Sequence, residues 1–62
     1  MNLVIGETYK MRRVTGRLVR FRLLEYDRET KSITLLELDS PSLATFNNLS
    51  EAELKSIERI NL

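Results

Sequence analysis

Residues 17–27 alternate charged and apolar side chains, and no other feature of the chain constrains its fold as strongly. Successive side chains of an extended chain point to opposite faces, so Arg20 and Arg22 share one face and the apolar residues around them share the other. The apolar set is Val19, Phe21 and Leu23. The stretch is therefore predicted to form a strand with a buried face and a cationic outer face.

Together with three neighbouring segments, this stretch predicts a series of strands separated by turn residues. The predicted strands are residues 8–14, 17–26, 32–38 and a short segment at 42–46. Gly16 supplies the first turn because glycine adopts a positive φ at little cost. Asp27 opens the turn at 27–31, since its side chain can accept hydrogen bonds from nearby backbone amides. Pro41 ends the third strand because it cannot donate to the ladder of hydrogen bonds.

Two leucine pairs shift the alternation by one residue, at Leu23-Leu24 and at Leu35-Leu36. A flat strand would expose one set of leucines, whereas a bulge or a sharp bend turns both sets toward the core. Strong bending is also what the closure of a small barrel from few strands requires. A sheet whose two faces are covered by neighbouring subunits explains the same pattern and remains the alternative.

A capping signature predicts a helical turn that begins at Ser50. Glu53 follows three residues later, as in a capping box, and Leu49 and Leu54 occupy the positions of a hydrophobic staple. One or two turns are expected, near residues 51–56. The last residues of the chain are expected to form a short strand, although their apolar spacing also fits a longer helix.

The chain of 62 residues is expected to form a single domain over residues 1–62, with a small core. It contains no cysteine and no histidine, so disulfides and thiolate zinc sites are excluded, and the commonest metal ligand and general base is missing. Self-association is the remaining way to supplement a core of this size. No segment has the length of a membrane span and the first residues do not resemble a secretory signal, so a cytoplasmic protein is expected.

The net charge of +1 conceals an uneven distribution. Residues 1–31 carry eight basic and four acidic side chains, a net charge of +4, whereas residues 32–62 carry two basic and five acidic side chains, a net charge of −3. This asymmetry favours a polyanion-binding surface on the N-terminal half. It also allows the basic edge of one subunit to meet the acidic edge of its neighbour.

Residue types that carry catalysis are scarce, and none has a local signature. Without histidine or cysteine, a nucleophile would need serine or threonine activated by lysine, and no motif supports one. Glu25 and Asp27 lie near Arg28 and Lys31, so ion pairing explains them better than acid–base chemistry. The oxygen ligands near Asp27 lack the spacing of a calcium loop, and the two glycines are too far apart for a phosphate loop. Neither an enzyme, a cofactor nor a metal site is expected.

The basic residues of the first half are the candidate binding residues. The predicted set is Arg12, Arg13, Arg17, Arg20, Arg22, Arg28 and Lys31. Arginine can pair with phosphate through parallel hydrogen bonds and can stack on bases. The alternative is that each arginine lies on a solvated strand face, discourages edge aggregation or pairs across the sheet with glutamate. Tyr9 or Tyr26 offers a stacking surface, whereas Phe21 and Phe46 fit a core.

The stretch from Leu23 to Leu35, LLEYDRETKSITL, resembles the first signature of the Sm and Sm-like RNA-binding proteins. In that signature a bent strand ends in an aromatic residue and Asp, before a loop and an apolar strand. The resemblance covers about residues 8–38 and implies a strongly bent five-stranded barrel that joins edge to edge into rings and binds single-stranded RNA around the pore. Thr30 stands where the family stacks a base, and Arg59 is followed by Ile60 where the family has glycine.

The expected protein is a small, mostly β, SH3-like or Sm-like barrel with one short helical turn. Its expected function is to bind RNA or single-stranded DNA through its basic strands, as a ring-like homo-oligomer with no membrane partner. The alternative is a structural or adaptor module whose sheet edges and charge asymmetry serve protein assembly alone. Arg59, in the acidic half, is expected to matter less for binding than Arg20 and Arg22.

Overall fold

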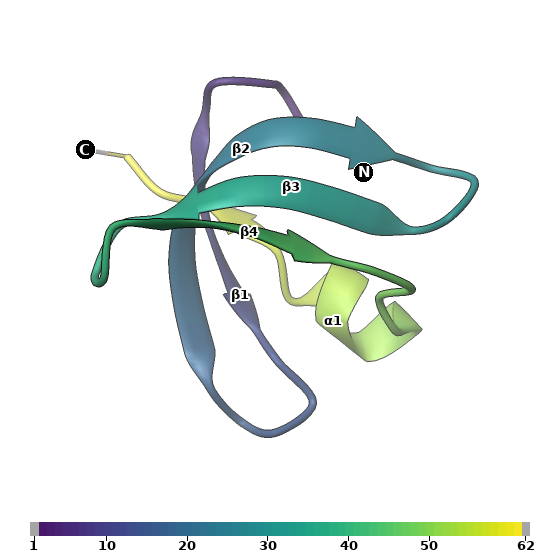
Figure 1. The fold of residues 1–62 in the computed structure, drawn as a ribbon. Coiled ribbons are helices and arrows are strands. Elements are labelled where there is room, and N and C mark those ends of the chain that lie inside the picture. The colour runs from purple at the N-terminus through teal and green to yellow at the C-terminus, as the bar shows by residue number, and fades with distance from the viewer. Residues whose placement is uncertain (1, 62) are drawn as a thin grey trace.

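The structure, a computed structural model, describes residues 2–61 and contains within them five strands and one short helix (Figure 1). The elements in chain order are β1 (Thr8–Arg12), β2 (Leu18–Asp27), β3 (Ser32–Glu37), β4 (Ser42–Phe46), α1 (Glu51–Lys55) and β5 (Glu58–Arg59). The prediction of a mostly β chain with one helical turn near residues 51–56 is confirmed. Among residues 2–61, no helix combines the length and the hydrophobicity needed to cross a membrane.

All five strands belong to one antiparallel sheet in the order β4-β3-β2-β1-β5. The first four strands follow one another as hairpins, and β5 returns to pair with β1, where Lys10 lies opposite Glu58. Figure 1 shows β2 curving through the sheet, so that β1 and the start of β2 run at a steep angle to β3 and β4. Within residues 2–61 the sheet stays open, because β4 and β5 each pair with one neighbour only.

The bend in β2 has a local cause at Leu24. Leu23 lies opposite Leu35 and Glu25 lies opposite Thr34, so Leu24 has no partner of its own and forms a β-bulge. An extra residue of this kind bends the strand that carries it and increases the local twist. The bulge predicted at this leucine pair is confirmed.

The second leucine pair does not produce a bulge. β3 pairs with β4 without a shift in register. Leu35 is therefore buried, whereas Leu36 lies half-buried on the outer face and Leu38 is 38% exposed. The prediction of a second bulge is wrong, because the bulge in β2 alone curves the sheet and leaves the alternation of β3 intact.

The core lies on the inner face of the curved sheet. Its buried apolar side chains are Tyr9, Met11, Val19, Phe21, Leu23, Ile33, Leu35, Leu49 and Ile57. Tyr9 and Phe21 are cross-strand neighbours with ring centroids 6.0 Å apart, and Tyr26 and Phe46 pack against this cluster. The Tyr9 hydroxyl accepts a hydrogen bond from the Val4 amide at 2.9 Å, so its polar end is satisfied. The placement of Phe21 in the core is confirmed.

α1 carries the predicted capping box. Ser50 is the N-cap: its Oγ accepts a hydrogen bond from the Glu53 amide at 3.1 Å, and Glu53 Oε1 accepts one from the Ser50 amide at 3.0 Å. Leu49 is buried and Leu54 packs against the core on the two sides of this box. The predicted start of the helical turn at Ser50 is confirmed, and its apolar flanks attach it to the sheet.

The ends of the first and last strands differ from the prediction. β1 ends at Arg12, two residues early, because the Val14 amide donates to Glu53 Oε2 at 3.3 Å instead of to a strand. β5 lies just before the residues predicted for the terminal strand. The Ile60 amide still donates to a carbonyl oxygen of β1 at 2.9 Å. Leu62, which the prediction assigns to that strand, lies outside the described residues.

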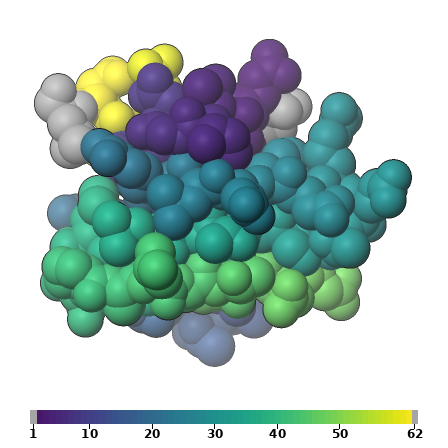
Figure 2. Space-filling model, turned by 45° about the horizontal axis from the view of Figure 1, so that its top comes forward, coloured from purple at the N-terminus to yellow at the C-terminus, as the bar shows by residue number. Residues whose placement is uncertain are grey.

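The residues before β1 and those after β5 lie close to each other. The Gly6 amide donates to the Leu23 carbonyl oxygen at 2.7 Å, so the N-terminal segment runs along β2. Figure 2 shows this segment in purple against the teal residues of β2, with the C-terminal residues in yellow beside it. Both segments line one hollow next to Arg22, on the cationic side of β2.

Ser50→Ala is expected to lower the free energy of unfolding by about 1 kcal/mol, because the Glu53 amide loses its N-cap acceptor. Ser40→Ala is the matched control, since Ser40 lies exposed in the loop between β3 and β4. Urea unfolding followed by circular dichroism measures both variants. Equal midpoints for the two variants would show that the capping box does not stabilise the fold.

Candidate functional site

The predicted cationic face is formed by β1 and β2 together. In their antiparallel register Lys10 lies opposite Arg20, and Arg12 and Arg22 lie two residues further along their strands, in opposite directions. These four residues alternate with buried residues of β1 and β2, so their side chains point away from the core. We call the set of Lys10, Arg12, Arg20 and Arg22 the outer strip.

The cations of the outer strip differ in their partners. Lys10 Nζ lies 3.4 Å from Glu58 Oε2 on the neighbouring strand β5. Arg12 Nη1 donates to the Gly16 carbonyl oxygen at 2.7 Å, which orders the side chain without neutralising it. Arg12, Arg20 and Arg22 form no ion pair among residues 2–61. The strip therefore carries three charges that the described residues do not compensate.

Arg13 does not belong to the outer strip. Its Nε lies 3.2 Å from Glu53 Oε2, and its guanidinium carbon lies 4.0 Å from the centroid of the Phe46 ring. The Arg13 side chain is 28% exposed, and its Nη1 atom is buried without a hydrogen-bond partner among the described residues. Arg13 therefore connects the end of β1 to α1 and β4.

The remaining three predicted residues also lie away from the outer strip. Arg17 Nη2 pairs with Glu37 Oε1, at the margin of the inner face of the sheet. Arg28 and Lys31 are exposed in the turn between β2 and β3, beyond the bulge. The structure thus brings together three of the seven predicted residues and distributes the other four over the molecule.

Two cations outside the predicted set contribute to this surface: Lys10 belongs to the outer strip, and Arg59 adjoins it. Lys10 alternates with the buried residues of β1, so the period of that strand would have placed it on the outer face. Arg59 pairs with Glu7 at 3.1 Å and lines two hollows, of about 540 and 310 Å³, that open beside Arg20 and Arg22. No local pattern could have placed Arg59 there, because β5 meets β1 only through pairing of distant segments.

An apolar surface borders the outer strip on the side of β3 and β4. Leu36 lies between Arg22 on β2 and Leu43 on β4. Leu43 is 73% exposed, and Leu38, just after β3, is 38% exposed. We call Leu36, Leu38 and Leu43 the apolar strip. Because β4 is an edge strand of the sheet, the apolar strip adjoins backbone groups that have no partner strand within the described residues.

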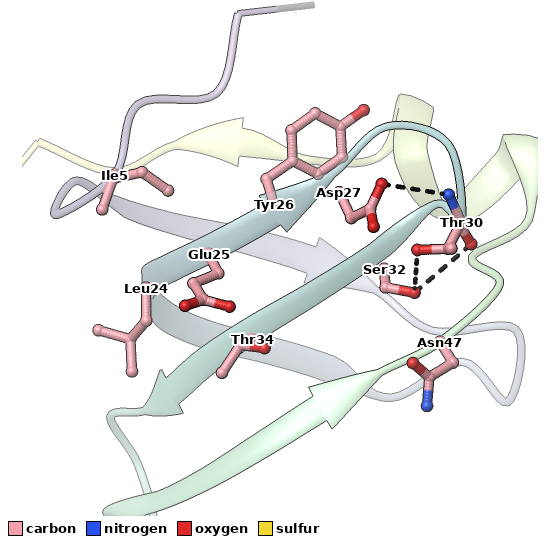
Figure 3. Close-up of a pocket in the computed structure, with 9 residues that line it drawn as sticks. All are labelled: Ile5, Leu24, Glu25, Tyr26, Asp27, Thr30, Ser32, Thr34 and Asn47. Carbon is pink, nitrogen blue, oxygen red and sulfur yellow. Dashed lines mark hydrogen bonds between the residues drawn. The ribbon is translucent and has the colours of Figure 1, made fainter.

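A hollow of about 510 Å³ lies beyond the bulge, over the far ends of β2 and β3 (Figure 3). Glu25 and Asp27 contribute two carboxylates to it, and none of its lining residues is basic. Asp27 Oδ1 accepts hydrogen bonds from the amides of Glu29 at 2.9 Å and Thr30 at 3.4 Å, so this carboxylate stabilises the turn. Within residues 2–61, no three His, Cys, Asp or Glu side chains are grouped to hold a metal ion. The chemistry of this hollow is unsuited to a polyanion.

Three surfaces are candidates for a functional site: the outer strip, the apolar strip and the hollow beyond the bulge, which we call the acidic hollow because Glu25 and Asp27 line it. Comparison with known protein families, with curated proteins and with solved structures finds no match to this chain. Two of the three surfaces gather charge of one sign without an ion-pair partner among residues 2–61: Glu25 and Asp27 in the hollow, and three arginines in the outer strip. Of these two, only the outer strip is cationic.

The stabilisation of the fold by the Glu53 carboxylate, which contacts Arg13, depends on pH. The Glu53 side chain is 6% exposed, and the hydrogen bond from the Ser50 amide is the main reason why the pKa of its carboxyl lies below the usual 4.5. Burial opposes this shift, whereas the hydrogen bond from the Val14 amide and the charge of Arg13 reinforce it. Because the pKa is lower in the folded chain, the stabilisation is complete above the unfolded value and is lost as the pH falls through the folded value.

Glu53→Gln is expected to lower the free energy of unfolding at neutral pH and to flatten its decrease below about pH 5, because the depressed carboxyl pKa is removed. Glu51→Gln is the matched control, since Glu51 lies in the same helix with a side chain that is 75% exposed. Urea unfolding at a series of pH values measures both variants. If Glu53→Gln kept the pH profile of the parent protein, Glu53 would not be a source of the acid sensitivity.

Proposed function

We propose that this chain is a nucleic-acid-binding module that binds RNA or single-stranded DNA through the outer strip, as part of a homo-oligomer. The observation that carries the proposal is the gathering of Arg12, Arg20 and Arg22 on one face without an ion-pair partner among residues 2–61. A guanidinium group can donate two parallel hydrogen bonds to a phosphate group, so such a row suits a phosphate backbone.

Repulsion between cations on neighbouring strands supports an anionic ligand for this face. Like charges placed directly opposite each other destabilise an antiparallel pair of strands, and Lys10 lies opposite Arg20. Glu58 offsets the charge of Lys10, but Arg20 has no such partner among the described residues. A bound polyanion would remove this repulsion, which favours a phosphate ligand over a neutral one.

The Sm-like or SH3-like barrel is part of the same proposal. The order β4-β3-β2-β1-β5, with α1 between the last two strands of the chain, supports it because this order brings the last strand back beside the first. The bulge at Leu24 supports it as well, since closure of few strands requires strong bending. Association of two copies edge to edge would give β4 and β5 the partners that they lack within the described residues.

A structural or adaptor module is the second candidate, and the apolar strip favours it. Leu43 is 73% exposed on an edge strand, and Leu36 beside it is half-buried. Exposed apolar side chains next to unpaired backbone groups form a surface suited to protein association. In this alternative, Arg20 and Arg22 meet carboxylates of a neighbouring protein instead of phosphates. Oligonucleotide binding at low salt separates the two candidates.

Arg20→Gln/Arg22→Gln is expected to weaken binding of a labelled single-stranded oligonucleotide and to make its salt dependence shallower. For a single strand, each phosphate that is no longer neutralised reduces the slope of log K against log salt by about 0.7, so the slope of the double variant should fall by about 1.4. Glutamine keeps part of the apolar stem of the side chain, which limits the effect on folding. Fluorescence anisotropy at several salt concentrations measures the slope.

Arg28→Gln/Lys31→Asn is the matched control, because it removes the same number of charges from the turn between β2 and β3. Asparagine suits position 31, where the backbone has φ 54°. Equal losses of affinity in the two double variants would mean that net charge, and not the outer strip, determines binding. Loss of binding in the control alone would transfer the site to the turn.

Leu43→Lys is expected to shift the protein from an oligomer toward a monomer, because a charge on an exposed edge strand opposes edge-to-edge pairing. Val14→Lys is the control, since Val14 is 71% exposed in the turn between β1 and β2 and lies on no edge strand. Light scattering without nucleic acid measures the molar mass. A parent protein that is monomeric at high micromolar concentration would contradict the homo-oligomer.

A further inference from the structure

The cations of the outer strip form a ladder with three steps. Arg12 stands at the first step, Lys10 and Arg20 stand opposite each other at the second, and Arg22 stands at the third. Neighbouring steps are two residues apart along the strands, which corresponds to about 6.8 Å in an antiparallel sheet. This interval is comparable to the separation of successive phosphates along one nucleic-acid strand. The ladder therefore fits three consecutive phosphates of a single strand.

The aromatic side chains lie elsewhere in the molecule. The chain has two tyrosines, two phenylalanines and no tryptophan. Tyr9 is 4% exposed and Phe21 is 1% exposed, and the Phe46 ring faces the guanidinium group of Arg13. Tyr26 is half-buried and lines the acidic hollow beyond the bulge. No aromatic ring therefore stands on the outer strip to hold a base.

The side chains beside the ladder do not replace the missing rings. Leu18 lies opposite Arg12, and Leu36 and Thr8 lie opposite Arg22 on its two sides. Glu58 lies opposite Lys10, so none of these flanking positions carries an aromatic side chain. Proteins that read single strands by sequence stack the splayed bases on aromatic or guanidinium planes while they bind the base edges. In the outer strip the guanidinium groups are the groups that can bind phosphate, so they are not free to stack on bases. Phosphate contacts fix the position of a strand but carry no sequence information directly.

We propose that the outer strip binds the phosphodiester backbone of a single strand and leaves its bases unread, so that affinity does not depend on base sequence. This inference rests on the proposed function and specifies what the same site recognises. Three phosphates bound per protomer correspond to a slope of log K against log salt of about −2, at about 0.7 per phosphate. Oligomerisation multiplies the number of bound phosphates without changing the chemistry that binds them.

The test compares labelled oligo(U), oligo(A) and oligo(C) of equal length at one salt concentration. Their affinities are expected to agree within about threefold, because phosphate contacts do not distinguish bases. Inorganic polyphosphate is expected to displace all three. Arg20→Gln/Arg22→Gln should weaken binding of the three oligonucleotides by the same factor. Tyr26→Leu, which removes a ring but keeps apolar volume, should leave binding unchanged while circular dichroism verifies that the variant is folded.

The outcomes separate this inference from the proposed function. A strong preference for one oligonucleotide, or loss of binding in folded Tyr26→Leu, would overturn base-independent recognition and leave nucleic-acid binding intact. Failure of polyphosphate to compete would overturn it as well, because the ligand would then need more than phosphates. Absence of binding to any of the oligonucleotides at low salt would overturn the proposed function itself.

Discussion

The position of every cation on β2 follows from the burial of three apolar side chains. Val19, Phe21 and Leu23 are at most 1% exposed, and a slip of one residue would exchange them with the arginines between them. Burial of each apolar side chain contributes about 1.5–3 kcal/mol. Burial of an unpaired charge costs several kcal/mol even after relaxation. A slipped register would lose the burial of the apolar side chains and would also bury the arginines, so both effects would destabilise it. The core on one face of β2 therefore determines which side chains stand on the other.

Part of the charge asymmetry between the two halves of the chain is neutralised by ion pairs within the molecule. Within the described part of the chain, three ion pairs join cations of the first half to carboxylates of the second: Lys10–Glu58, Arg13–Glu53 and Arg17–Glu37. Exposed pairs contribute about 0–1 kcal/mol, but Glu53 is buried and also accepts hydrogen bonds from two backbone amides, so it holds the residues after β1 against α1. Part of the excess of positive charge in the first half is therefore offset by contacts between the halves. Only the cations that remain without a counterion bear on a ligand.

Local patterns predicted most of the fold, because the interactions that produce it are local. The alternation of residues 17–27, the turn at Gly16 with φ 92° and the capping box at Ser50 each depend on neighbours within a few positions. The site was predicted less completely. Alternation separates Arg12 from Arg13, but the pairing of Arg13 with Glu53 depends on a helix near the other end of the chain. The same distance explains why no sequence pattern placed β5 beside β1.

The hydrogen bonds that attach the last segment of the chain also set an order of folding events. The Arg12 amide binds Ser56 Oγ across 44 residues and the Val14 amide binds Glu53 across 39, whereas the hairpins from β1 to β4 close over short turns. Contacts between distant residues form slowly, although each doubling of loop length adds only about 0.6 kcal/mol of closure entropy. We therefore expect the four-stranded meander to form before α1 and β5 dock. A chain at that stage already presents its ladder of cations, and Lys10 still lacks Glu58, so the ladder carries one more uncompensated charge than in the finished fold.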